Sequence, residues 1–102
     1  FPQIAGLGFS STAQFYAIRD LNEAKAYISH PVLGERLLEI SRALTQLPCS
    51  DPTSVMGYPD DLKLCSCMTL FELVSDDPVF AEVLDKFYGG RRDARTLRLL
   101  GL

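Results

Sequence analysis

The chain has few of the residues that build metal sites and disulfide scaffolds. Among its 102 residues there are three cysteines and one histidine. Three cysteines cannot all pair within one chain, so a disulfide framework is disfavoured and a reducing, cytoplasmic environment is expected. The chain also lacks any apolar run near the roughly 18 residues that a bilayer-spanning helix requires. A soluble domain with no membrane partner is therefore expected.

The chain has no excess of positive charge either. Ten lysines and arginines stand against thirteen aspartates and glutamates, and the formal net charge is −3. Proteins that hold nucleic acid by bulk electrostatics usually carry a strong basic excess, so no nucleic-acid partner is expected. The period-two alternation of half-buried strands is absent too. With 47% hydrophobic residues, residues 1–102 are expected to form a single domain with one core.

The chain does contain repeated signals that start and end helices. In "DLNE", Glu23 follows Asp20 by three residues as a capping box, and the helix that begins there should end at His30 because a proline follows. Aspartate precedes a helix start again at Asp51-Pro52 and Asp77-Pro78, where its carboxylate can accept from free backbone N–H groups.

The last helix is predicted at "ARTLRLL", which Asp93 caps and Gly101 ends, and Gly89-Gly90 should close the helix before it. A short helix is expected at "STAQFYAI", residues 11–18. These signals predict an all-α domain of five or six short helices.

Residues 30–47, "HPVLGERLLEISRALTQL", carry a helical stripe. The apolar residues recur at spacings of four and three, which predicts one face turned to a core or to a partner helix; they are Leu33, Leu37, Ile40, Leu44 and Leu47. Gly34, in the first turn, costs about 1 kcal/mol against alanine. It is expected to mark a close contact between helices.

The stretch "YPDDLKLCSCMTLFELV", residues 58–74, predicts a central, mostly buried helix that begins at Pro59. Helical residues two apart point about 200° away from each other, so Cys65 and Cys67 should neither share a zinc ion nor form a disulfide. Adding Cys49 and His30 does not give the spacing of a zinc knuckle. No metal and no cofactor are expected, and the two cysteines of the helix are interpreted as small buried hydrophobes.

A polar strip on this helix leaves two interpretations open. Asp60, Lys63, Ser66 and Cys67 follow one another at helical spacings, so they should share a face. In the first interpretation, the charge of Lys63 favours the thiolate of Cys67 in a shared pocket. In the second, Lys63 is a surface residue paired with Asp60 or Asp61.

His30 invites a catalytic interpretation because it is the only histidine. Its place before a proline at a helix start favours a capping or linking role instead. No serine or cysteine partner for it can be chosen from the sequence.

The best binding signal is "GGRRDARTLR". Gly89 and Gly90 can bring backbone N–H groups together and Arg91 and Arg92 add positive charge, so this loop suits an anion. The simpler alternative is a turn that ends a helix, with both arginines paired to Asp85, Asp93 or water.

Two functional classes remain open. The first is a small binding or interaction module for a ligand that bears a phosphate or carboxylate, or for a partner protein. The second is an enzyme whose pocket joins Lys63, Ser66 and Arg91 or Arg92 with residues upstream of Phe1. Binding is preferred because no pair of nucleophile and base is recognisable. The candidate ligand-binding residues are Lys63, Ser66, Gly89, Gly90, Arg91 and Arg92.

Three of these motifs, "HPVLGERL", "YPDDLKLCSCMTLFELV" and "FYGGRRDARTLRLLG", also carry a resemblance. Over nearly its whole length the chain resembles the family called domain of unknown function 1810, which occurs in bacteria and fungi and is sometimes mislabelled calpastatin. The resemblance implies an all-helical single domain and supplies no activity. Calpastatin is a disordered protease inhibitor, whereas this chain has the composition of a packed domain.

Two departures from the family pattern bear on function. The family usually has a basic residue where this chain has Cys65, and it extends upstream of Phe1 through a helix and a segment resembling Ser-His-Trp. The chain is therefore expected to lack an N-terminal segment. It is also expected to form a homodimer or to associate with that segment, because uncovered apolar faces associate.

Overall fold

The structure, a computed structural model, describes residues 1–3, 6 and 17–102. This part of the chain contains six helices and no strand, which confirms the expected all-α class; the helices are α2 (Leu21–Ser29), α3 (Leu33–Thr45), α4 (Pro52–Met56), α5 (Asp60–Glu72), α6 (Val79–Tyr88) and α7 (Ala94–Leu99). The helix expected at 11–18 lies outside the described residues, apart from positions 17 and 18, which are not helical.

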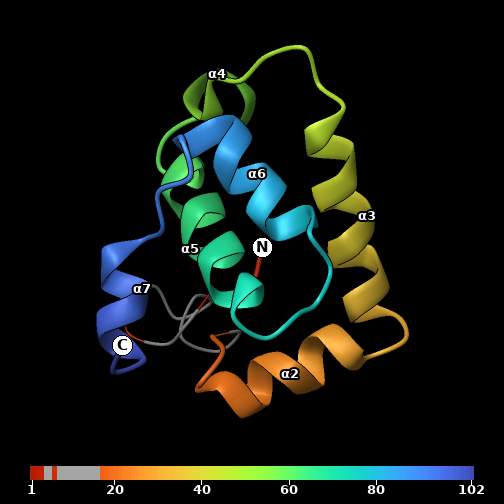
Figure 1. Cartoon of the computed structure of the whole chain (residues 1–102), viewed down its shortest axis with the longest axis vertical. Coiled ribbons are helices and arrows are strands. Elements are labelled where there is room, and N and C mark those ends of the chain that lie inside the picture. Colours follow the sequence, from red (N-terminus) through yellow and green to blue (C-terminus); the bar gives the residue numbers. More distant parts are fainter. Residues whose placement is uncertain (4–5, 7–16) are drawn as a thin grey trace.

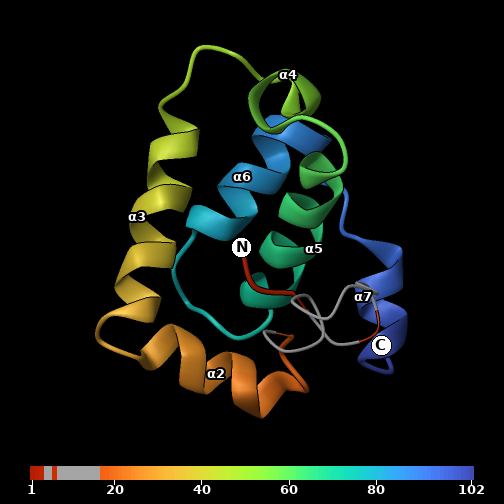
Figure 2. The same ribbon diagram turned by 180° about the vertical axis from the view of Figure 1, so that it is seen from behind.

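The central element is α5, which contacts α2, α4, α6 and α7, while α3 packs on α2 and α6 (Figures 1 and 2). From Leu64 to Phe71, α5 is almost entirely buried, because apolar and small polar residues follow one another there without a charge, whereas Asp60, Leu62 and Lys63 in its first turn are exposed. The buried residues are Asp61, Leu64, Ser66, Cys67, Met68, Thr69, Leu70 and Phe71. The prediction of a mostly buried central helix starting near Pro59 is confirmed.

Aromatic contacts join three helices in the core. Phe71 of α5 is fully buried, and its ring centroid lies 5.6 Å from that of Tyr27 on α2 and 5.9 Å from that of Phe80 on α6. Tilted pairs at such distances are each worth about 0.5–1.5 kcal/mol beyond the burial of their area. Tyr27 is thus held firmly in place at one side of α5.

The predicted aspartate caps are present at four helix starts. Each carboxylate accepts from a backbone N–H group in the first turn; the pairs are Asp20 with Glu23, Asp51 with Thr53, Asp77 with Val79 and Asp93 with Thr96. Gly89 ends α6 in the left-handed conformation (φ 62°), where a side chain is disfavoured. These local signals are confirmed because they depend on only three or four neighbouring residues.

The stripe predicted on α3 is only partly correct. Leu37 and Leu44 are buried, but Leu33, Ile40 and Leu47 are 39%, 48% and 37% exposed. The buried face is centred closer to Gly34 and Ser41, because α3 turns that face toward α2 and α6. Leu33, Ile40 and Leu47 therefore form an exposed edge beside the core.

In the described part of the chain, no helix combines the length and the apolar character needed to cross a membrane.

Candidate functional site

The predicted anion cradle is assembled only in part. A cleft of about 440 Å³ lies between α5, the end of α6 and the loop before α7; its lining residues are Cys65, Phe87, Tyr88, Gly89, Arg91, Arg92, Asp93 and Ala94. The structure thus brings Gly89, Arg91 and Arg92 together. Lys63, Ser66 and Gly90 do not line this cleft.

The two arginines of the cleft are not equivalent. Arg92 donates to both carboxylate oxygens of Glu72, at 2.5 and 2.6 Å, and this hydrogen-bonded ion pair raises the pKa of Arg92. The Arg91 side chain makes no hydrogen bond or ion pair to any described residue. Among the described residues, the Arg91 guanidinium is therefore left without a partner, and Asp93 lines the same cleft.

Lys63 and Ser66 are engaged elsewhere. The Lys63 ammonium lies 3.9 Å from Asp60 on the exposed side of α5, as the surface interpretation predicted. Ser66 is buried, and its hydroxyl donates to the Leu62 carbonyl one turn back along the helix. Neither side chain is therefore aimed at a common ligand.

The interpretation of Cys67 as a thiolate stabilised by Lys63 is wrong. Cys67 is fully buried, and burial raises the pKa of its thiol to about 12. Cys65 is half-buried, and burial together with the charge of Asp93 raises the pKa of its thiol to about 11. Both cysteines lie on the continuous helix α5 and are unpaired, so both are neutral at physiological pH.

His30 has a structural role that its position predicted. Its Nδ1 accepts from the backbone N–H groups of Val32 and Leu33, both at 3.1 Å. These are free donors at the start of α3, and an imidazole nitrogen that satisfies them replaces the usual aspartate cap. The proton of the neutral ring is thereby assigned to Nε2.

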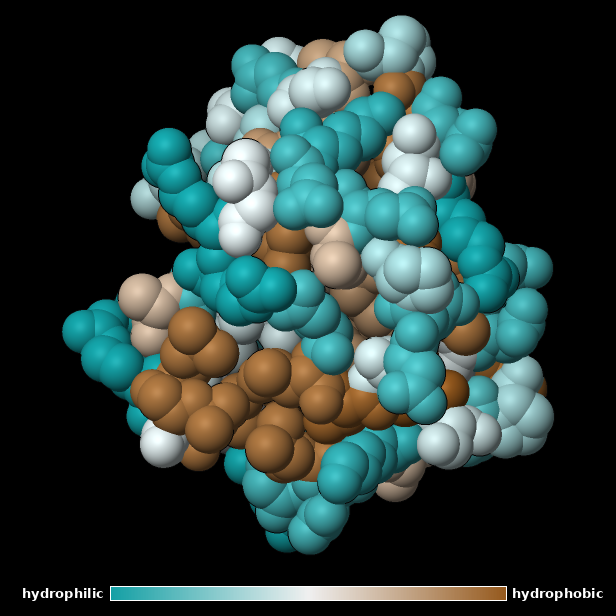
Figure 3. All heavy atoms as spheres, viewed as in Figure 1, coloured by the Kyte–Doolittle hydropathy of each residue, from teal (hydrophilic) through white to brown (hydrophobic). Residues whose placement is uncertain are grey.

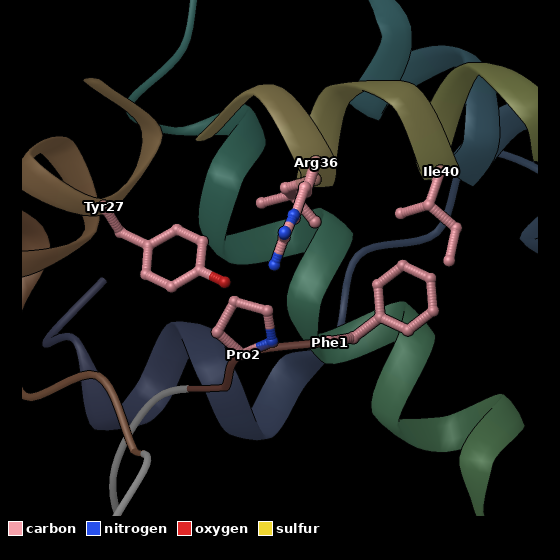
Figure 4. A pocket seen from close by; sticks show the side chains of 6 residues that line it. Phe1, Pro2, Tyr27, Arg36 and Ile40 are labelled. Atoms are coloured by element: carbon pink, nitrogen blue, oxygen red, sulfur yellow. The ribbon is translucent and has the colours of Figure 1, made fainter. Parts of the chain in front are cut away.

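A second hollow, which the sequence did not reveal, lies between α2 and α3 (Figure 4). This α2–α3 groove has a volume of about 240 Å³ and is lined by Phe1, Pro2, Tyr27, Arg36, Leu37 and Ile40. Figure 4 shows the Tyr27 hydroxyl and the Arg36 guanidinium pointing into the same space, with Pro2 nearby and the Phe1 ring beside Ile40. Two polar groups thus converge in a mostly apolar hollow.

Each polar group of the α2–α3 groove is positioned by its own helix. Tyr27 lies near the end of α2 and rests on Phe71, and Arg36 lies in the first turns of α3. Burial raises the pKa of Tyr27 above its usual value of 10.0, so its hydroxyl remains a hydrogen-bond donor at neutral pH. Neither side chain has a hydrogen-bond partner among residues 1–3, 6 and 17–102.

Residues able to hold a metal do not cluster in the described part of the chain, where no three histidine, cysteine, aspartate or glutamate side chains come together. The aspartates that precede the helices are occupied as caps. The two hollows are therefore suited to binding a ligand through a guanidinium, a phenol and apolar side chains.

Comparison with known proteins places the chain in a family. The model of the family described as "Protein of unknown function (DUF1810)" matches residues 1–100. The chain belongs to this family. This confirms the resemblance that the sequence motifs indicated.

A solved structure agrees with the helical architecture. The crystal structure of the conserved hypothetical protein Rv1873 from Mycobacterium tuberculosis has a TM-score of 0.94 and 44% sequence identity, and the match covers 98% of this chain and 72% of that chain. No curated protein matched the chain.

Proposed function

We propose that this domain is a binding module for a small anionic ligand, and that the α2–α3 groove is its site. The observation that carries the proposal is the convergence of the Tyr27 hydroxyl and the Arg36 guanidinium in one apolar hollow (Figure 4). Pockets that bind small molecules are typically apolar with a few converging polar groups. A guanidinium pairs with a carboxylate through two parallel hydrogen bonds, and a phenol can supply a third donor.

The size and walls of the α2–α3 groove narrow the ligand class. Its volume of about 240 Å³ is below the roughly 300–1,000 Å³ of sites that hold drug-sized molecules. The ligand is therefore small, and its body is apolar because Leu37, Ile40 and Phe1 provide the walls. A compact aromatic or branched monocarboxylate has the right charge, size and polarity.

A binding role is favoured over catalysis. The alternative was an enzyme built on Lys63, Ser66 and an arginine, but the hydroxyl of Ser66 is buried and bonded to Leu62. His30, the only imidazole, is engaged as a cap. Covalent catalysis requires a nucleophile beside a base in a pocket. Among the described residues, the hydroxyls that donate to a carboxylate lie at helix starts and line neither hollow; they are those of Thr53, Ser54 and Thr96.

The cleft at Arg91 is a second candidate for an anion. Its free guanidinium supports the proposal, while the neighbouring carboxylate of Asp93 opposes it. Charge-assisted contacts are worth about 1.5–3 kcal/mol in a sheltered site and close to nothing on an open surface. Inorganic phosphate suits this wider and more polar cleft, whereas an apolar carboxylate suits the α2–α3 groove.

The test measures binding of benzoate by calorimetry and by thermal shift, with benzyl alcohol and acetate as matched probes that lack the charge or the apolar body. We expect benzoate to raise the melting temperature, since a ligand that binds only the folded state stabilises it. Arg36→Gln should abolish this response, and Tyr27→Phe should weaken binding by about tenfold through loss of one hydrogen bond.

Arg91→Gln is the control variant, because it removes a guanidinium from the other hollow. It should keep the benzoate response and lose any response to phosphate. If the benzoate response persists in Arg36→Gln but disappears in Arg91→Gln, benzoate binds in the cleft at Arg91 and not in the α2–α3 groove. No response of the parent protein to benzoate would show that the α2–α3 groove is not an anion site.

A further inference from the structure

The last helix, α7, carries a surface of basic and apolar residues, and none of these residues lines the α2–α3 groove. Four arginines and one aspartate lie between positions 91 and 98 of a chain whose net charge is −3. Arg95, Arg98 and Leu99 are exposed and share one face of α7, since they lie three and four residues apart. We call this surface, together with the adjoining Leu102, the α7 face.

The apolar part of the α7 face consists of two exposed leucines. Leu99 is 48% exposed and Leu102, the last residue of the chain, is 66% exposed. Figure 3 shows apolar side chains gathered at the C-terminal end of α7 and extending toward the lower end of α5, where Leu73 is 40% exposed. Contiguous apolar surface with a polar rim is typical of interaction sites.

The α7 face is held rigidly against the body of the protein. Thr96, on the opposite side of α7, is fully buried and its hydroxyl donates to the Asp93 carboxylate. The Asp93 backbone N–H in turn donates to the Thr69 hydroxyl on α5, at 2.8 Å. A partner therefore meets a preformed surface, which lowers the entropy lost on binding.

The two arginines of the α7 face are available for a partner. Unlike Arg92, which is paired with Glu72, neither Arg95 nor Arg98 forms an ion pair within the described residues. Arginine forks match carboxylates in a planar, two-bond geometry. Charge complementarity therefore favours an acidic partner with an apolar side chain to cover Leu99 and Leu102.

We propose that the α7 face docks a short acidic peptide segment of a partner protein, with carboxylates on Arg95 and Arg98 and an apolar side chain against Leu99 and Leu102. A peptide is favoured over a bilayer, because the face is a small patch of two arginines and two leucines at a helix of six residues, which a segment of a few residues can cover. It is favoured over nucleic acid, because a phosphate backbone leaves the exposed leucines uncovered.

The test is fluorescence anisotropy with a labelled synthetic peptide of alternating glutamate and leucine, and with a second peptide in which serine replaces leucine. We expect the first peptide to bind more tightly, and its binding to weaken as salt rises from about 0.05 M to about 0.3 M. The double variant Arg95→Gln/Arg98→Gln should weaken binding by about tenfold or more, and Leu99→Ser by a few fold.

Arg36→Gln is the control that separates this proposal from the α2–α3 groove, and it should bind the peptide as the parent does. Circular dichroism and melting curves confirm that the surface variants fold. Equal binding of both peptides, or binding that survives the double variant, would overturn the proposal. The proposal would also be overturned if anionic vesicles or an oligonucleotide bound more tightly than the peptide and the double variant lost that binding.

Discussion

Gly34 of α3 lies directly against the backbone of Ile28 in α2. A Cβ atom placed on Gly34 would be 2.0 Å from the Ile28 carbonyl oxygen and 2.6 Å from its carbonyl carbon. Real Cβ atoms do not approach other atoms so closely, so only glycine allows α2 and α3 to meet at this corner. The same corner places Tyr27 and Arg36 around one hollow, and the glycine thus contributes to the geometry of the α2–α3 groove.

The first prediction is that Gly34→Ala destabilises the protein. Helix propensity alone would make alanine better by about 1 kcal/mol, whereas forcing backbone apart in a packed contact costs about 1–3 kcal/mol or more. We expect the clash to win, so that the midpoint of urea denaturation falls. A rise of the midpoint would mean that the two helices separate easily and that the close contact is unimportant.

The second prediction concerns the accessibility of the three thiols. Cys49 is exposed, whereas Cys65 is half-buried and Cys67 is buried, and burial raises the pKa of both helical thiols. Since the thiolate is the reactive form, iodoacetamide near neutral pH should modify Cys49 first. Intact-mass spectrometry should find a single adduct on the folded protein and three after unfolding in guanidinium. Rapid modification of Cys67 in the folded state would contradict its burial.

The third prediction follows from the thiol of Cys67. Its pKa rises from the ordinary value of 9.0 to about 12 on folding, so the folded protein keeps a proton that the unfolded chain releases. The stabilisation is therefore complete below about pH 9 and is lost as the pH rises toward about 12. Urea denaturation should show a free energy of unfolding that falls steadily across this alkaline window.

The matching variant is Cys67→Ala. It should be less stable at neutral pH, because it leaves a small cavity in the core, yet its stability should depend less on pH in the alkaline window. Some dependence should remain, because burial also raises the pKa of Cys65, Tyr27 and Tyr88. An identical pH dependence of parent and variant would show that Cys67 is not the group responsible.

Local features of the fold were predictable from the sequence, and the reason is physical. A cap joins residues two or three apart, so Asp51, Asp77 and Asp93 could be placed without knowing how the helices pack. Gly89 similarly ends α6 through its own backbone conformation. Such signals depend on the chain near them and not on distant contacts.

The sites were harder to predict because they depend on helix packing. Helical spacing brought Lys63 and Cys67 onto neighbouring positions, but the packing of α5 buries the thiol and leaves the lysine outside. Tyr27 and Arg36 looked like ordinary residues of two separate helices, and no local pattern links them. Only the corner between α2 and α3 joins them in one groove.

The last prediction is the pH dependence of carboxylate binding in the α2–α3 groove. Burial raises the pKa of Tyr27 above 10.0, so its hydroxyl can donate to a carboxylate throughout the neutral and mildly alkaline range. At the acid end, the ligand itself becomes protonated near the usual carboxylic pKa of roughly 4. Benzoate affinity should therefore be constant from about pH 6 to about pH 9 and should fall below about pH 5.

Tyr27→Phe keeps the ring on Phe71 and removes only the donor, so it is the informative variant for this pH dependence. Its benzoate affinity should be lower by the same factor at every pH from about 6 to about 9, because the hydroxyl of the parent does not ionise there. Calorimetric titrations of both proteins at several pH values make the comparison. If the parent loses affinity between about pH 7 and about pH 9 while the variant does not, the hydroxyl ionises in that range. Tyr27 would then be a titrating group of the α2–α3 groove and not a constant donor to the ligand.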